Sequence, residues 1–121
     1  MRILLYLLTT TFVVFAALQL NDPDPGLWAP LYLVPATVTF LAARGRFPAV
    51  IGGGLAIAYA VLAAWWWPAR YDGLTGAMNP HTTVEEARES LGLLIAAAGL
   101  GLSSYAVRRA RAQAREADSA A

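Results

Sequence analysis

Residues 19–32 read QLNDPDPGLWAPLY and separate two long apolar segments of the chain. Pro23 and Pro25 disfavour the helical conformation at the residues before them, so a preceding helix has to end here. Asp22 and Asp24 therefore stand at a junction between hydrophobic segments, where a charged carboxylate needs a polar surface. The stretch predicts a turn between two membrane-spanning helices, with its acidic side chains at the membrane surface.

The rest of the chain repeats this apolar character. Of its 121 residues, 58% are hydrophobic and 14% are charged, whereas soluble domains are about 25% charged. The stretches without any charge are 3–20, 27–43, 47–69 and 90–107. A helix needs about 20 mainly apolar residues to cross a bilayer. We therefore expect an all-α fold, an integral membrane four-helix bundle over residues 1–110. The expected spans are about 3–20, 27–43, 47–67 and 88–107, followed by a short cytoplasmic tail, 111–121.

The distribution of arginine predicts the orientation. Four spans threaded in order place seven of the nine arginines on one side of the membrane: Arg2, Arg44, Arg46, Arg108, Arg109, Arg111 and Arg115. The other side holds Arg70 and Arg88 with most of the acidic residues. Because cytoplasmic loops retain basic residues, we expect the chain in the cytoplasmic (inner or plasma) membrane, with both termini in the cytoplasm.

Two further features limit the interpretation. The first apolar run follows Arg2, as in a signal peptide, but it is long and lacks a small-residue cleavage pattern before Asn21, so we expect a retained helix. The chain contains no cysteine, which excludes disulfides and metal sites built on thiolates.

Several patterns predict how the spans pack. Small residues recur every fourth position at Gly52, Ala56, Ala60 and Ala64, which predicts a close helix contact along that face. Pro35 falls inside the second span and predicts a kink. The rings of Trp28, Tyr32 and Trp65–Trp67 lie near the same end of their spans, as in the aromatic belt of a membrane interface.

The start of the last span carries the second acidic group. Thr83 and Glu86 have the spacing of a capping box, in which each side chain bonds the other residue's backbone amide. We expect the helix to begin outside the bilayer and to enter it after Ser90. Arg88 then lies where it can form an ion pair with Asp22 or Asp24.

The same acidic residues allow two other interpretations. A divalent cation such as Ca²⁺ or Mg²⁺ takes oxygen ligands, and the candidate metal ligands are Asp22, Asp24, Glu86, Glu89 and His81. A pocket for a small polar molecule or a lipid headgroup is the second alternative. The candidate cluster for binding comprises Asn21, Asp22, Asp24, Trp28, Tyr32, Glu86, Arg88 and Glu89.

The motif from Gln19 to Pro25, followed by Trp28 and Tyr32, resembles the transmembrane protein 220 family. The segment EARESLG from Glu86 to Gly92, at the head of the last span, supports the same resemblance. The resemblance extends over the whole topology and implies a small integral membrane protein with four spans. It implies no particular activity.

We expect a non-enzymatic bundle whose extracytoplasmic acidic cluster docks a protein partner, a lipid headgroup or an ion. The lipid bilayer is the expected environment, a membrane protein or a second copy of the chain is a candidate partner, and no nucleic acid is expected. The alternative is a small oligomeric transporter or channel, whose path would pass Thr9–Thr11 and Ser103–Ser104. An enzyme using paired carboxylates is a third interpretation, for which no catalytic motif is present.

Overall fold

The computed structural model describes residues 1–21, 25–74 and 83–121, and every regular element in this part of the chain is a helix. Helix α1 spans Arg2–Leu18 and continues into the short 3-10 helix η1, Gln19–Asn21. Helices α2, Pro25–Ala43, and α3, Ala49–Trp66, are followed by α4, Val84–Ala120. All four α-helices are long and apolar enough to cross a membrane. The predicted all-α membrane fold with four spans is therefore confirmed.

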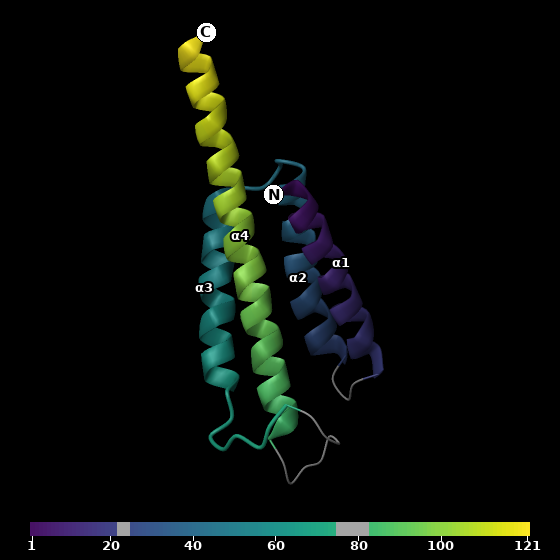
Figure 1. Ribbon diagram of the computed structural model, residues 1–121. Coiled ribbons are helices and arrows are strands. Elements are labelled where there is room, and N and C mark those ends of the chain that lie inside the picture. The colour runs from purple at the N-terminus through teal and green to yellow at the C-terminus, as the bar shows by residue number, and fades with distance from the viewer. Residues whose placement is uncertain (22–24, 75–82) are drawn as a thin grey trace.

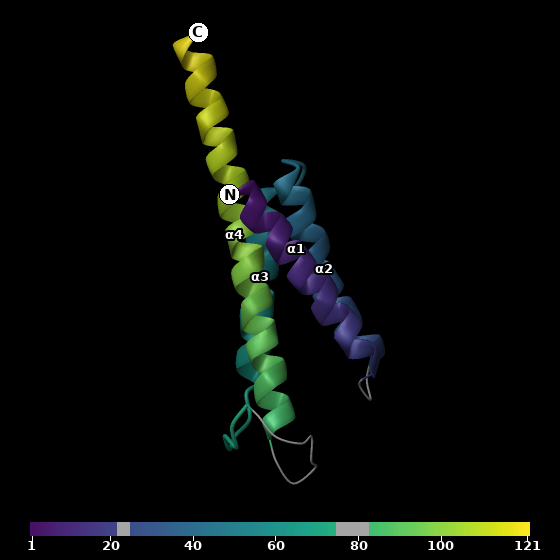
Figure 2. The ribbon, with the colours of Figure 1, turned by 45° about the vertical axis from the view of Figure 1, so that its right-hand side comes forward.

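The helices form two antiparallel pairs, α1 with α2 and α3 with α4 (Figure 1). Contacts between α2 and α4 join the pairs. Figure 2 shows that the α1–α2 pair diverges from the α3–α4 pair toward the end that carries η1 and the first turn of α4. At the opposite end, α4 extends beyond the bundle as an exposed helix. Residues 111–121, the expected tail, thus continue α4 through Ala120.

Pro35 explains one contact between the two pairs. Proline has no backbone N–H, so the carbonyl of the residue four positions earlier, Leu31, loses its partner within the helix. The hydroxyl of Tyr59 in α3 donates a hydrogen bond of 2.7 Å to that carbonyl oxygen. A membrane interior offers no water to replace a missing partner. Tyr59 therefore both satisfies the exposed carbonyl of α2 and ties α2 to α3.

Small residues bring the helices together, but not along the whole predicted face. Gly52 is buried against α4, and a Cβ added to it would lie 3.4 Å from the Cβ of Ser104. Ala60 and Ala64, in contrast, are exposed. A step of four residues turns a helix by about 40° more than a full circle, so three such steps leave the contact face. The buried positions of α3 are instead Ala49, Gly52, Tyr59 and Ala63. The predicted contact face was therefore wrong at Ala60 and Ala64.

The hydroxyl groups of the spans bond to separate neighbours. Thr9 of α1 and Thr39 of α2 lie within 2.8 Å of each other. Thr10 and Thr11 are not buried in the bundle, and their hydroxyls donate to the carbonyls of Tyr6 and Leu7 one turn earlier. Ser104 donates across to the Ala49 carbonyl. These hydroxyl groups therefore bond to separate partners, which gives no support to a continuous hydrophilic path.

Candidate functional site

Helix α4 begins at Val84 with Thr83 as its N-cap, as expected, but without the predicted capping box. The backbone N–H of Thr83 donates to Asp72 Oδ2 at 3.0 Å, and the Thr83 hydroxyl donates to the carbonyl of Arg70. Arg70 also donates to both carboxylate oxygens of Asp72, at 3.1 Å each. The capping box was wrong because Asp72, from the preceding loop, takes the acceptor role that the spacing assigned to Glu86.

The Asp72 contacts predict an acid-dependent stability. Hydrogen bonds from the Arg70 side chain, then from the Thr83 backbone, hold the pKa of Asp72 below its usual value. A group with a lowered pKa in the folded state stabilises the fold above its unfolded pKa of about 3.9. This stabilisation is lost as the pH falls from that value through the folded pKa. Thermal unfolding between pH 7 and pH 3 should show a smaller acid-induced loss in Asp72→Asn than in wild type, and equal losses would contradict this account.

Two tryptophans connect the start of α4 with α2. Trp28 is 3% exposed and meets the ring of Trp66 edge to face, at 5.6 Å between centroids. The indole N–H of Trp66 donates to Glu89 Oε2 at 2.6 Å. Trp65 and Trp67, which are 82% and 44% exposed, have the outward position expected for an interfacial belt. Trp28 and Trp66 are therefore packing residues that fix the Glu89 carboxylate.

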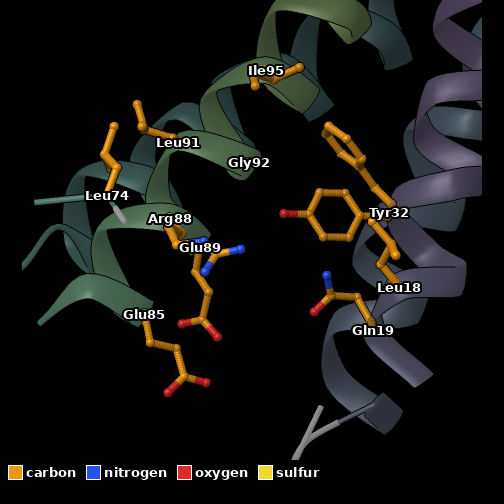
Figure 3. A pocket seen from close by; sticks show the side chains of 11 residues that line it. Leu18, Gln19, Tyr32, Leu74, Glu85, Arg88, Glu89, Leu91, Gly92 and Ile95 are labelled. Carbon is orange, nitrogen blue, oxygen red and sulfur yellow. The ribbon is translucent and has the colours of Figure 1, made fainter. Parts of the chain in front are cut away.

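A cavity of about 320 Å³ lies beside Glu89, between the end of α1, helix α2 and the first turns of α4 (Figure 3). Its polar lining consists of Gln19, Tyr32, Glu85, Arg88 and Glu89. Its apolar lining consists of Phe15, Leu18, Leu74, Leu91 and Ile95. Gly92 completes the wall, facing the hydroxyl of Tyr32. The charged side chains thus line the cavity at the first turns of α4, while Phe15, Leu91 and Ile95 give it an apolar part further along α1 and α4.

The structure brings together only part of the predicted cluster. Tyr32, Arg88 and Glu89 line the cavity. Trp28 supports Glu89 through Trp66, Asn21 is exposed, and Glu86 is not among the lining residues. Three predicted residues lie outside the described part of the chain: Asp22, Asp24 and His81. The predicted ion pair of Arg88 with Asp22 or Asp24 therefore also falls outside it.

The sequence prediction missed Gln19 and Glu85 as residues of the site. The pattern Glu85, Arg88–Glu89, Gly92 and Ile95 repeats at three and four residues, which places these residues on one helix face. That spacing could have identified the α4 wall of the cavity. The contribution of α1 could not be found in this way, because it depends on how the two helix pairs diverge.

The described part of the chain contains no group of three acidic or histidine side chains placed to hold a metal ion. Of the candidate ligands, only Glu86 and Glu89 lie in this part. Glu89 points into the cavity, whereas Glu86 Oε2 is buried and has no hydrogen-bond partner among the described residues. These two carboxylates alone therefore do not form a cation site.

The comparisons with known proteins agree with the fold. A family model described as "Transmembrane family 220, helix" matches residues 11–105, which include all of the cavity lining. No solved structure matches the chain. Since the match covers most of the sequence, this integral membrane protein belongs to transmembrane family 220.

Proposed function

We propose that the protein is a non-enzymatic membrane bundle that docks the headgroup of a lipid in the cavity between α1 and α4. The observation that carries the proposal is the division of one cavity into a charged part and an apolar part. An amphipathic ligand needs both, because its polar head has to be bonded while its apolar portion stays out of water.

The wall of the cavity supports a lipid over a soluble ligand. Leu18 and Ile95 border the cavity from α1 and α4 and are 63% and 44% exposed on the bundle. In a bilayer, side chains exposed at this depth contact lipid acyl chains. A headgroup in the cavity can therefore remain attached to chains that lie in the surrounding membrane.

The proposed orientation places this cavity in the outer half of the membrane. The arginine-rich end of the bundle would face the cytoplasm, following the bias of cytoplasmic loops. Because the chain has no cysteine, single substitutions report accessibility without background. A membrane-impermeant maleimide should label Asn21→Cys in intact cells and label Ser119→Cys only after lysis. The reverse pattern would place the cavity at the cytoplasmic surface.

A pair of tryptophan substitutions tests the docking of lipid. Ile95 lines the cavity, while Leu94 does not, and both are 44% exposed. The larger ring in Ile95→Trp should occupy the cavity and exclude the headgroup, whereas Leu94→Trp adds the same surface outside it. Each variant would be purified in mild detergent and its bound phospholipid measured by mass spectrometry. We expect loss of lipid only from Ile95→Trp. Equal lipid content in the two variants would contradict the proposal.

A further inference from the structure

We infer that the cavity selects a zwitterionic headgroup in which a phosphate and an ammonium group are neighbours, as in phosphatidylethanolamine. This inference rests on the proposed function and specifies its ligand. The charged side chains of α4 support this inference through their sign and their direction into the cavity. Figure 3 shows the side chains of Glu85, Arg88 and Glu89 turned toward the same space, with the amide of Gln19 opposite them.

The charges of opposite sign define two neighbouring subsites. The guanidinium of Arg88 suits a phosphate, because its fixed donors match the geometry of phosphate oxygens. Glu85 and Glu89 are one helical turn apart and both line the cavity, so their carboxylates can accept hydrogen bonds from one ammonium group. A ligand that carries both groups satisfies both subsites.

The same arrangement opposes ligands with one charge. A headgroup with a phosphate and no cation, such as that of phosphatidylglycerol, would bring its charge close to the two carboxylates. A simple cation would meet Arg88. Placing like charges together in a partly dry site is a common means of rejecting the wrong ligand. The cavity is therefore suited to distinguish an aminophospholipid from an anionic one.

The carboxylate of Glu89 is held in place before any ligand binds. Trp66 donates to it at 2.6 Å, and the Trp66 ring is packed against the buried Trp28. A group held by its neighbours in this way loses little freedom on binding, which favours selective recognition.

The size of the cavity indicates that the acyl chains stay outside it. Its volume of about 320 Å³ is near the lower limit of small-molecule pockets, about 300–1,000 Å³. A headgroup fits this space, while the chains would pass between Leu18 and Ile95 into the bilayer. The expected occupant is therefore a membrane lipid and not a soluble phosphoamine.

A competition between two lipids tests the inference. The full-length protein in detergent is mixed with equal amounts of phosphatidylethanolamine and phosphatidylglycerol with identical chains, and the bound ratio is read by native mass spectrometry. The ratio does not depend on the fraction of folded protein. Wild type should prefer phosphatidylethanolamine about tenfold, the contribution of one charge-assisted hydrogen bond. Glu85→Gln and Glu89→Gln should bring the ratio close to one.

A third substitution in the cavity, Arg88→Gln, should weaken binding of both lipids. The control variants are Arg108→Gln and Glu116→Gln, at exposed positions of the same helix away from the cavity, and they should match wild type. Equal binding of the two lipids by wild type would overturn the inference and leave the docking of lipid intact. Binding of neither lipid would overturn the proposed function as well. Displacement of bound lipid by an equal concentration of soluble phosphoethanolamine would overturn the choice of a lipid as the occupant.

Discussion

Gly92→Ala is expected to destabilise the bundle by about 1–3 kcal/mol, the usual cost of forcing extra volume into a packed contact. A Cβ at this position would lie 1.8 Å from the hydroxyl oxygen of Tyr32 and 2.9 Å from the ring carbon that carries it. The Tyr32 ring cannot move away easily, since it is 5% exposed and packs edge to face on Phe15. Gly99→Ala should behave alike, because its Cβ would lie 2.8 Å from the Phe12 ring.

Gly101→Ala is the matched control on the same helix. A Cβ added to Gly101 would lie 3.9 Å from the Cβ of Ala56, which is an ordinary van der Waals contact. Replacing glycine by alanine within a helix favours the helix by up to about 1 kcal/mol, so this variant should be as stable as wild type or more so. Stability can be measured by unfolding the protein in mixed micelles with increasing denaturing detergent. If Gly92→Ala and Gly101→Ala unfold alike, α2 does not approach α4 at Gly92 as closely as described.

Tyr59→Phe is expected to cost about 1–2 kcal/mol, because the Leu31 carbonyl would lose the hydrogen bond that replaces its missing helical partner. The loss should be smaller when the chain also carries Pro35→Ala, since that substitution restores a backbone N–H to α2. A double-mutant cycle over Tyr59 and Pro35 measures this coupling directly. Tyr105→Phe, at a position that is 53% exposed, is the control. Equal costs of Tyr59→Phe with and without Pro35 would show that the two residues are not coupled.

The prediction of four membrane-spanning helices was confirmed because it used properties that the bilayer imposes on every residue. The length of the charge-free segments and the two prolines at positions 23 and 25 limit where helices can begin and end. Pro25 shows the limit of this accuracy. Helix α2 begins at that proline, two residues before the expected start, because a proline fits the first helical turn without losing a hydrogen bond.

Features that depend on contacts between helices were predicted less well. The four-residue repeat in α3 identified Gly52 correctly but could not show that Ala60 had rotated away from the contact face. Thr83 marked the start of α4, yet the acceptor for its backbone N–H came from Asp72, eleven residues earlier. Glu89 was predicted to belong to a polar cluster. Its indole partner could not be predicted, because Trp65, Trp66 and Trp67 are equivalent until the packing of α3 is known.

On the proposed function, the cavity beside Arg88 and Glu89 receives the headgroup of a lipid. The most direct measurement is a crystal structure of the wild-type protein grown from a lipid phase that contains phosphatidylethanolamine. We predict electron density for a headgroup between Arg88 and Gln19, continuous with an acyl chain that leaves between α1 and α4. A cavity that holds only water, or that is closed by the side chains of Tyr32 and Arg88, would contradict the account.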